Sequence, residues 1–474
     1  MFTQPPGDGR FADHGQGSCR SPTPTLKVTP VPTQYILTTA PGALPLLGHA
    51  PAFVRRPYEF VAGLPAHGDL VRLRLGPLDA YVACHPDLVR QLLTEHRVYD
   101  KGGLIFDRAR EVFGDGLITC PASDHRRQRR LLQPAFHRER LPGYAAIMAE
   151  EIAGAIAPWR NGQVIDVPAA MHRLTIAATA RCLFAAHEQA GSLPVHDSMN
   201  IVIKGVARRV MMPLPGLNRI PTPGNHRYQR ARADLAEITR RLIAAYRAAG
   251  TDHHDLLSIL LAARDDDGRG LSDEEIHDQM VTFLLAGMET TAATLSWAWT
   301  LLAAHPSVRE RLHTELDTVL DGRPARHEDL PALPLTTRIV TETLRLYPPA
   351  WILSRVVADG DAELGGHRVP AGATILYSPY LLHRRADLFP ALDRFDPDRW
   401  LTNSRPTPGT YTPFGAGARR CIGDAVGTTE ATLAIATIAT HWSLTPIPGR
   451  PIRPTRGSSM TPRPFTATLT RRPR

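Results

Sequence analysis

Cysteine is scarce in this chain of 474 residues, and the few that occur are widely scattered. They are Cys19, Cys84, Cys120, Cys182 and Cys421. Their odd number and wide spacing exclude both a disulfide framework and a CxxC zinc site, which indicates a reducing compartment. Residues 1–30 also lack the apolar core of a signal peptide, so we expect a cytoplasmic protein.

Long apolar runs are missing as well. The most apolar stretch, residues 280–288, is stopped by Glu289, whereas about twenty residues are needed to cross a bilayer. The sequence therefore predicts no membrane span.

Lysine is almost absent, since three lysines stand beside 52 arginines, and the net charge is +9. Such a skew is typical of a GC-rich genome, and the arginines are spread among 46 acidic residues. We therefore expect no nucleic-acid partner. A basic docking face for an acidic protein stays open.

Composition along the chain predicts two segments. Residues 1–35 are rich in Pro, Gly, Ser and Thr and are expected to be disordered. Residues 36–474 contain no internal repeat and no linker, so we expect a single domain. Residues 86–350 have a mostly helical pattern, which makes the predicted fold class mainly α with minor β.

Short alternating segments predict the β structure. Residues 69–76 and 79–85 alternate in polarity and indicate a small sheet. A second β patch is expected within residues 367–379, and another near the C-terminus. The prolines of residues 41–49 forbid a regular helix there.

One predicted helix is unusually long. Ser272 and Glu275 form a capping-box pattern at its start, and His305-Pro306 ends it. At 1.5 Å per residue the helix spans roughly 50 Å. Its centre carries the polar, helix-weakening segment AGMETT, residues 286–291, inside an apolar stripe. Polar groups in a core need a partner or a function.

The most specific segment is FGAGARRCIG, residues 414–423. Two glycines permit a tight loop, Cys421 closes it, and a helical stretch follows. Amides at a helix N-terminus favour a thiolate, so Cys421 is a candidate metal ligand or nucleophile. Taken alone, a cysteine is more often a buried structural residue than a ligand or nucleophile. The complete pattern F-G-x-G-x-R-x-C-x-G resembles the heme-thiolate signature of the cytochrome P-450 superfamily, with no substitution at a defining position.

This resemblance implies the mainly α cytochrome P-450 heme-thiolate fold. It implies heme b (iron protoporphyrin IX) as cofactor, with Cys421 as the axial iron ligand and Phe414 beside the heme. The expected activity is monooxygenation of an apolar small molecule with O2. Because nothing in the chain resembles flavin or nicotinamide binding, electrons are expected from a separate ferredoxin and ferredoxin reductase using NADPH.

Two further motifs match the family in order along the chain. Ala286, Gly287, Glu289 and Thr290 match its oxygen-binding stretch. The resemblance implies that Ala286 and Gly287 border the heme, and that Glu289 and Thr290 relay protons to dioxygen. In isolation, a satisfied polar pair in a core helix is the alternative.

Glu342 and Arg345 form the E-x-x-R pattern, with acid and arginine on one helix face. In the family this pair meets the arginine of a later segment, here FDPDRW with Arg399. The resemblance implies a structural charge network that braces the core beside the heme.

The helix of residues 124–137 resembles the one that crosses the edge of the heme. His125 and Arg129 fit the spacing of the family's propionate partners, and Arg355 and Arg419 fit the other two positions. Three further arginines on this helix are expected to point outward and, with Arg420 of the cysteine loop, to form a docking face for an acidic ferredoxin. They are Arg126, Arg127 and Arg130.

Narrower similarity also exists. PGALPLLGHA and LRLYPPAWILSR, among other strings, are similar to bacterial sesquiterpene oxidases, and most of all to enzymes that oxidise pentalenene. This implies oxidation of an allylic methyl to the alcohol and then the aldehyde, in antibiotic biosynthesis. The candidate pocket-lining residues, with ordinary core packing as the alternative, are Leu104, Ile105, Phe106, Ala350, Trp351, Ile352 and Leu353.

Two other functions stay open. The nearer is a monooxygenase of another apolar scaffold, such as a different terpene, a fatty acid or a polyketide. The other is a non-catalytic heme-thiolate protein that senses a ligand. The intact Glu289-Thr290 pair argues against a sensor, which needs no proton delivery.

Overall fold

The computed structural model describes residues 35–473 without 77, 185–197, 199–200, 203–204, 206–208, 210–219, 251–254, 402–405, 450 and 458. Residues 35–474 group into one compact unit. Residues 1–35 are expected to be disordered. All of them except Tyr35 lie outside the described residues. No described helix combines the length and apolarity that a membrane span requires.

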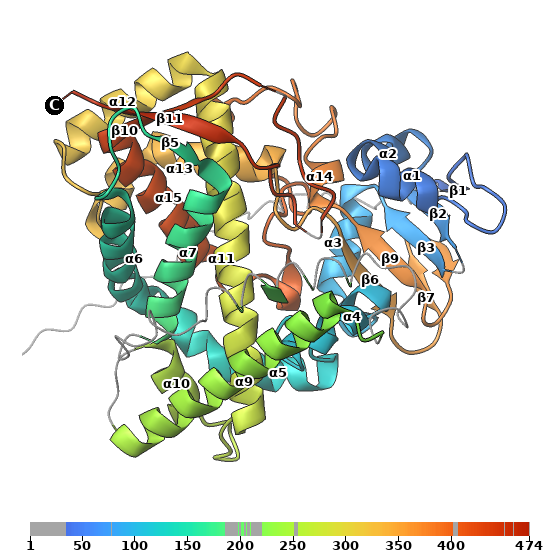
Figure 1. Ribbon diagram of the computed structural model, residues 1–474. Coiled ribbons are helices and arrows are strands. Elements are labelled where there is room, and N and C mark those ends of the chain that lie inside the picture. The colour runs from blue at the N-terminus through green and yellow to red at the C-terminus, as the bar shows by residue number, and fades with distance from the viewer. Residues whose placement is uncertain are drawn as a thin grey trace, which may run out of the picture. The chain divides into compact units, whose positions relative to one another are not determined.

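Helices make up most of the unit (Figure 1). They are α1 (Ala50–Arg55), α2 (Pro57–Gly63), α3 (Pro86–Thr94), α4 (Leu104–Phe113), α5 (Ala122–Leu132), α6 (Leu141–Ile156), α7 (Val167–Leu183), α9 (Pro223–Ala249), α10 (Leu256–Ala262), α11 (Asp273–Ala304), α12 (Pro306–Leu320), α13 (Pro334–Leu346), α14 (Pro379–Leu382) and α15 (Asp424–His441). The strands are β1 (Leu37–Thr39), β2 (Leu70–Leu75), β3 (Leu78–Ala83), β4 (Tyr99–Asp100), β5 (Val164–Asp166), β6 (Leu353–Val357), β7 (Ala362–Leu364), β8 (His367–Val369), β9 (Thr374–Tyr377), β10 (Trp442–Pro446) and β11 (Thr466–Arg471). The mainly α class with minor β is confirmed.

Helix α11 is the predicted long helix. The Ser272 hydroxyl accepts a hydrogen bond from the Glu275 amide at 3.1 Å, and the Glu275 carboxylate accepts one from the Ser272 amide at 2.8 Å. These bonds satisfy two amides that the first helical turn leaves without a partner. The predicted capping box is therefore confirmed, and the helix ends at Ala304, directly before His305-Pro306.

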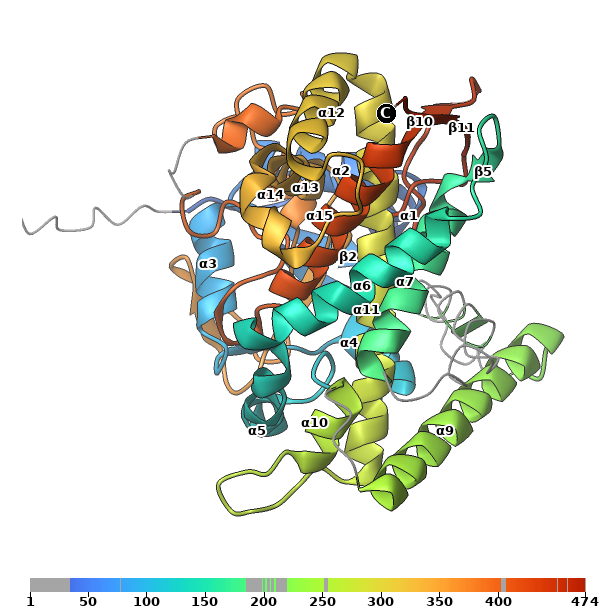
Figure 2. The same cartoon turned by 90° about the vertical axis from the view of Figure 1, so that its left-hand side faces the viewer.

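Apolar faces of several helices meet along α11. It packs against α7, α15 and α13, and α6 packs against both α7 and α15. One core cluster joins buried side chains of all these helices. Figure 2 shows α6 and α7 side by side along α11, with α9 at the lower end of the same view.

The main sheet lies to the right of α11 in Figure 1 and has the strand order β1-β2-β3-β9-β6-β4. Strands β2 and β3 confirm the first predicted β segments, and β8 and β9 fall within the second. Strand β10 pairs antiparallel with β11 near the C-terminus, also as predicted. At the far edge, β4 pairs with β6 so that Asp100 lies opposite Val356. This pairing brings the chain after Asp100 next to Arg355, which positions part of the site.

Candidate active site

The cysteine loop, residues 414–423, is a tight turn between extended chain and α15. Gly417 has a φ of +67°, and a Cβ atom there would lie 2.1 Å from the carbonyl oxygen of Leu93. Only glycine fits this position without displacing backbone. The amide of Cys421 donates a 2.9 Å hydrogen bond to the carbonyl oxygen of Phe414. The loop is thereby closed with Cys421 at its end.

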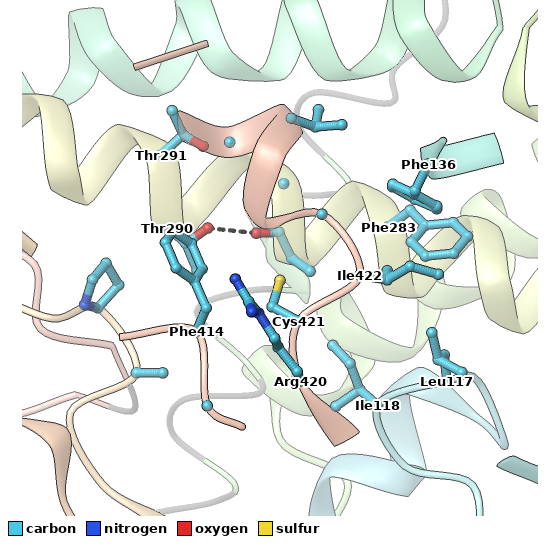
Figure 3. Close-up of a pocket in the computed structure, with 18 of the residues that line it drawn as sticks. Leu117, Ile118, Phe136, Phe283, Thr290, Thr291, Phe414, Arg420, Cys421 and Ile422 are labelled. Carbon is cyan, nitrogen blue, oxygen red and sulfur yellow. Dashed lines mark hydrogen bonds between the residues drawn. The ribbon is translucent and has the colours of Figure 1, made fainter. Parts of the chain in front are cut away.

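The loop opens onto a cavity of about 360 Å³. Figure 3 shows the sulfur of Cys421 pointing into it, with the guanidinium of Arg420 next to the sulfur, the ring of Phe414 beyond it and Thr290 on the α11 side. The walls are mostly apolar and include Phe106, Leu117, Ile118, Phe136, Phe283, Ala350, Leu353 and Ile422. A thiol therefore faces an apolar chamber inside the protein.

The protonation of Cys421 differs from the sequence-based expectation. Its side chain is accessible from the cavity, yet it lies deep in the protein. Burial raises the pKa of the Cys421 thiol, although the Gly423 amide and the nearby Arg129 and Lys101 act in the opposite direction. The Gly423 amide acts in the direction expected of a helix N-terminus, but desolvation outweighs it in the protein without a bound group. A bound metal ion would ionise the thiol by direct coordination.

All four side chains predicted to bind propionates line this cavity, namely His125, Arg129, Arg355 and Arg419. Arg355 is buried, donates to the carbonyl oxygen of Ser354 at 2.8 Å, and lies over the ring of Tyr377 at 5.3 Å. Arg419 forms a 2.6 Å ion pair with Asp100. The structure thus brings together groups that are up to 294 residues apart in the sequence, from His125 to Arg419.

Lys101 is a fifth basic residue of the cavity, and sequence reasoning missed it. Its ammonium donates a 3.0 Å hydrogen bond to the carbonyl oxygen of Ile118. Burial, with Arg355 and Arg419 nearby, lowers the pKa of Lys101 to about 7. Burial and the surrounding cations likewise lower the pKa of His125 to about 3. The one signal in the sequence is that Lys101 is one of three lysines in the chain.

Arg419 pairs with Asp100, but Lys101, Arg129 and Arg355 form no ion pair with a described acid. Among the described cavity-lining residues, Glu430 is the one carboxyl, and Asp100 is occupied by Arg419. Like charges in a desolvated site repel one another unless anions lie between them. The arrangement therefore fits a ligand that carries carboxylates at one edge and is otherwise apolar.

The α11 segment presents small residues and one hydroxyl to the cavity. Ala286, Gly287 and Thr290 all line it. A Cβ atom on Gly287 would lie 3.1 Å from the side chain of Thr179 on α7, so the glycine also permits close packing of the two helices. The Thr290 hydroxyl donates to the carbonyl oxygen of Ala286 at 2.7 Å and stays accessible from the cavity.

Glu289 is placed differently from Thr290. It is not among the described residues that line the cavity, because adjacent helical residues point about 100° apart. Burial raises the pKa of Glu289 to about 7. The sequence predicted the two side chains as a pair, and the structure brings Thr290 alone onto the cavity wall.

The predicted charge network has a buried ion pair at its centre. Arg345 donates two hydrogen bonds, of 2.8 and 2.9 Å, to the carboxylate of Glu342, and both side chains are fully buried. Arg399 lies 3.6 Å from Glu342, but its Nε makes no hydrogen bond within the described part of the chain. The indole of Trp400 donates to Glu342 at 2.9 Å instead. Sequence reasoning missed this contact of Trp400.

The expectation that three arginines of α5 point outward holds for Arg126 and Arg130, which are exposed, and fails for Arg127. Arg127 forms ion pairs of 2.7 Å with both Asp265 and Glu275. Arg130 pairs with Asp266. Arg127 therefore joins α5 to the start of α11 and to the preceding loop, since those acids neutralise it there. For Arg127 the prediction of a free solvated charge is wrong.

Arg126 remains on the surface, whereas Arg420 lines the cavity beside Cys421 (Figure 3). Arg126 is exposed, and none of its atoms forms an ion pair with a described acid. Arg420 is exposed and pairs with Asp424. Helix α5 contacts the cysteine loop, because Arg129 donates to the carbonyl oxygen of Arg420 at 2.6 Å.

Three of the seven predicted pocket residues line the cavity, namely Phe106, Ala350 and Leu353. The side chains of Leu104 and Ile105 lie outside the described residues. Trp351 and Ile352 belong to the core beside the main sheet, where Trp351 packs on Tyr58 with ring centroids 4.7 Å apart. For these two the alternative of ordinary core packing is correct.

A long helix with small residues, facing a cysteine loop across an apolar cavity edged by cations, defines the class of heme-thiolate oxygenases. The family model described as Cytochrome P450, here written P-450, matches residues 39–469. The chain belongs to the cytochrome P-450 family.

Its relatives extend over nearly the whole chain. Cyclooctat-9-en-7-ol 5-monooxygenase of Streptomyces melanosporofaciens is 48% identical over 90% of this chain and 94% of its own length. Pentalenene oxygenase of Streptomyces avermitilis is 47% identical over 89% of this chain and 94% of its own length. Cyclooctatin synthase of S. melanosporofaciens is 48% identical over 90% of this chain and 94% of its own length. The resemblances stated from the motifs are confirmed, and the protein is a monooxygenase of this family.

The family carries heme iron and needs O2 and redox partners, and the described residues fit this cofactor. The thiol reaches the cavity, the walls are apolar, and Lys101, Arg129 and Arg355 lack an ion pair with a described acid. These are the donor types that an iron porphyrin with two propionates requires.

Proposed function

We propose that the cavity holds heme b, with Cys421 as the axial ligand of its iron, and that the protein oxidises a polycyclic terpene. The observation that carries the proposal is the opening of the Cys421 sulfur into an apolar cavity edged by unbalanced cations. When bound, the heme supplies the activation of O2 and the insertion of one oxygen atom into a C–H bond.

Each group of residues has a part in holding the cofactor. His125, Arg129, Arg355 and Arg419 bind the propionates, and Lys101 joins them. Phe414 would contact the cofactor from the cysteine loop, and Ala286 and Gly287 would border it from α11. Glu342, Arg345 and Arg399 brace the core that supports the cysteine loop.

Glu289 and Thr290 manage protons on the α11 side. Because the Thr290 hydrogen is directed to Ala286, its oxygen is free to accept a hydrogen bond from water in the cavity. The carboxyl of Glu289, with its pKa near 7, exchanges a proton readily at neutral pH, which general acid catalysis requires. Thr290 thus binds a water molecule in the cavity, and Glu289 supplies protons to that water.

The apolar walls favour a substrate with few polar groups. Phe106, Ala350 and Leu353 exclude water from the substrate side. Pentalenene, oxidised at an allylic methyl to the alcohol and then the aldehyde, is our first candidate substrate. Cyclooctat-9-en-7-ol is the second, since the relative named for it is equally similar. Other terpenes, fatty acids and polyketides follow, and a ligand sensor comes last.

Electrons are proposed to come from a ferredoxin and its NADPH-dependent reductase in the cytoplasm of a bacterium. Arg126 offers exposed positive charge on α5, whereas Arg420 of the cysteine loop pairs with Asp424 and lines the cavity. An acidic ferredoxin docking there would shorten the path to the thiolate side of the heme.

Two measurements test the proposal. Reduced protein with carbon monoxide should give the absorption band of thiolate-ligated heme. Incubation with pentalenene or cyclooctat-9-en-7-ol, ferredoxin, reductase and NADPH should then yield an oxygenated product from one of them. The band without product from any terpene tested would leave the heme assignment standing and overturn the substrate class.

A further inference from the structure

The α4–α5 segment, residues 114–121, supplies part of the cavity wall. Its side chains Leu117 and Ile118 line the cavity, and Figure 3 shows the two next to each other at the lower right of the close-up. A segment without helix or strand has no regular ladder of backbone hydrogen bonds. Its position therefore depends on which other groups bind its backbone.

Two buried glutamines hold the first half of this segment. The Leu117 amide donates to the Oε1 of Gln279 on α11 at 3.0 Å. The Nε2 of Gln279 donates to the Oε1 of Gln128 on α5 at 3.0 Å, and the Nε2 of Gln128 donates to the carbonyl oxygen of Asp115 at 2.8 Å. Gln279 is fully buried and Gln128 is 3% exposed. Neither is among the described residues that line the cavity, so both act on the wall from behind it.

Side chains of other elements hold the rest of the segment. The Asp115 amide donates to the carboxylate of Asp278 on α11 at 2.8 Å. Three consecutive carbonyl oxygens accept hydrogen bonds from cations, namely Ile118 from Lys101 at 3.0 Å, Thr119 from Arg110 at 2.8 Å and Cys120 from Arg419 at 3.1 Å. The segment therefore cannot shift as a unit without breaking several of these bonds.

Close contact adds to the bonds. A Cβ atom on Gly116 would lie 2.2 Å from the hydroxyl oxygen of Thr282 on α11, so a side chain there would push the segment away from the helix. The wall formed by Leu117 and Ile118 thus has a fixed shape. Such a wall favours a rigid polycyclic hydrocarbon, because a flexible chain loses more conformational entropy when it is ordered against it.

We propose that Gln279 and Gln128 are specificity-determining residues, which fix Leu117 and Ile118 so that the cavity takes a rigid polycyclic terpene in preference to a flexible acyclic one. This rests on the proposed function. The glutamines are positioning residues, since they act through the α4–α5 segment. Their test therefore needs a signal other than stability.

A purely structural role would have a different signature. Backbone groups of any buried segment need partners, and the loss of one partner then lowers the free energy of unfolding and nothing else. Thr437 of α15 is such a partner. Its hydroxyl accepts a hydrogen bond from the buried Ala325 amide at 3.0 Å, and it is absent from the described lining of the cavity. Thr437→Val is therefore the matched control.

Amide hydrogen exchange tests the anchoring. In the wild-type holoenzyme the Leu117 amide should exchange slowly. Gln279→Met should speed its exchange by about tenfold, which is the effect of one lost hydrogen bond, because methionine is unbranched and adapts to the space but accepts hydrogen bonds poorly. Thr437→Val should leave this amide unchanged. Fast exchange of the Leu117 amide in wild type would overturn the proposal.

Ligand selectivity tests the consequence. The probes are two pairs of isomers, pentalenene with acyclic farnesene and cyclooctat-9-en-7-ol with acyclic geranylgeraniol, and their dissociation constants come from the substrate-induced spectral shift. Wild type should bind the polycyclic member of at least one pair more tightly. Gln279→Met should reduce this preference severalfold at unchanged heme content, and Thr437→Val should retain it. An unchanged preference in Gln279→Met, or an equal loss in Thr437→Val, would refute the specificity role.

A second variant covers the case in which Gln279→Met does not fold. Gln128→Met leaves the bond from Leu117 to Gln279 intact but frees the Asp115 carbonyl and removes the acceptor of the Gln279 amide. It should reduce the preference in the same direction, and a preference equal to that of wild type would count against the proposal.

The two proposals fail in distinguishable ways. If wild type oxidises none of the polycyclic terpenes, the proposed function fails, whereas hydrogen exchange still reports on the anchoring by Gln279. If product forms but wild type binds both members of each pair equally, the specificity role alone is wrong.

Discussion

The hydroxyl of Thr290 donates a 2.7 Å hydrogen bond to the carbonyl oxygen of Ala286, one turn earlier on α11. With the hydrogen directed along the helix, the oxygen faces the cavity as an acceptor. A threonine that only packed in a core would not expose its oxygen to the chamber that Cys421 also faces. The bond therefore leaves the Thr290 oxygen as the atom that can accept a hydrogen bond from water.

Replacing Thr290 by Ala should leave heme content and the substrate-induced spectral shift nearly intact. Product per NADPH should fall severalfold and peroxide should rise, because water is no longer held where protons are needed. Both products are measured under the same ferredoxin supply. Thr300→Ala is the control, since Thr300 makes the same intrahelical bond, at 3.0 Å to Ser296. Equal coupling in Thr290→Ala and the control would return Thr290 to a packing role.

Replacement of Cys421 tests the ligand. Cys421→His should still bind some heme but lose the carbon monoxide band of thiolate-ligated heme, because imidazole takes the axial position. Cys84→Ser is the control, as Cys84 is buried in the core beside the main sheet. Survival of the thiolate band in Cys421→His or Cys421→Ser would mean that another residue ligates the iron.

Local patterns were enough for much of this molecule. The bounds of α11 follow from a capping box, an apolar stripe and a final proline, all of which act within one segment. Strands β2 and β3 follow from alternation and a tight connection. Strand β4 was missed because two residues carry no period, and its pairing with β6 joins positions more than 250 residues apart.

The errors at the site have the same origin. Lys101 meets Arg355 only because β4 pairs with β6. Arg127 looked like a solvated charge because its acidic partners are 138 and 148 residues away along the chain. Glu289 and Thr290 are adjacent in sequence, yet helical geometry points them in different directions.

Lys101→Met should stabilise the protein without heme and weaken heme binding in the protein with heme. Without heme it removes a buried cation that Arg355 and Arg419 repel, so the free energy of unfolding should rise. With heme it removes a propionate partner, and a charged hydrogen bond is worth about 1.5–3 kcal/mol. The loss of that bond should make heme transfer from this protein to apomyoglobin tenfold faster or more, because about 1.4 kcal/mol corresponds to a factor of ten in rate. Arg126→Met, at an exposed site, is the control. If Lys101→Met stabilised, or destabilised, the protein both with and without heme, Lys101 would not be a propionate partner.

The pH dependence of coupling tests Glu289. Its folded pKa of about 7 lies above the ordinary value of 4.5, so the folded state binds more protons between these values. The free energy of unfolding contributed by this group therefore falls as pH rises from about 4.5 to 7 and is constant above. Glu289 also loses its transferable proton as pH rises through 7. Product per NADPH should decline over pH 6.5–8 in wild type, and Glu289→Gln should be lower with a flatter profile. Profiles of identical shape would assign the titration to another group.

Charge reversal at α5 separates docking from structure. Arg126 is exposed and carries no described ion pair, so Arg126→Glu should slow electron transfer from an acidic ferredoxin severalfold at low salt. High salt should shrink the difference, because screening weakens long-range attraction. Arg127→Glu should behave otherwise, since it sets a third acid beside Asp265 and Glu275. It should lower the free energy of unfolding by about 1–2 kcal/mol, seen as a lower melting temperature. Stopped-flow reduction and thermal melts distinguish the two. A salt-independent rate in Arg126→Glu would leave Arg126 as plain solvated surface and place the ferredoxin elsewhere.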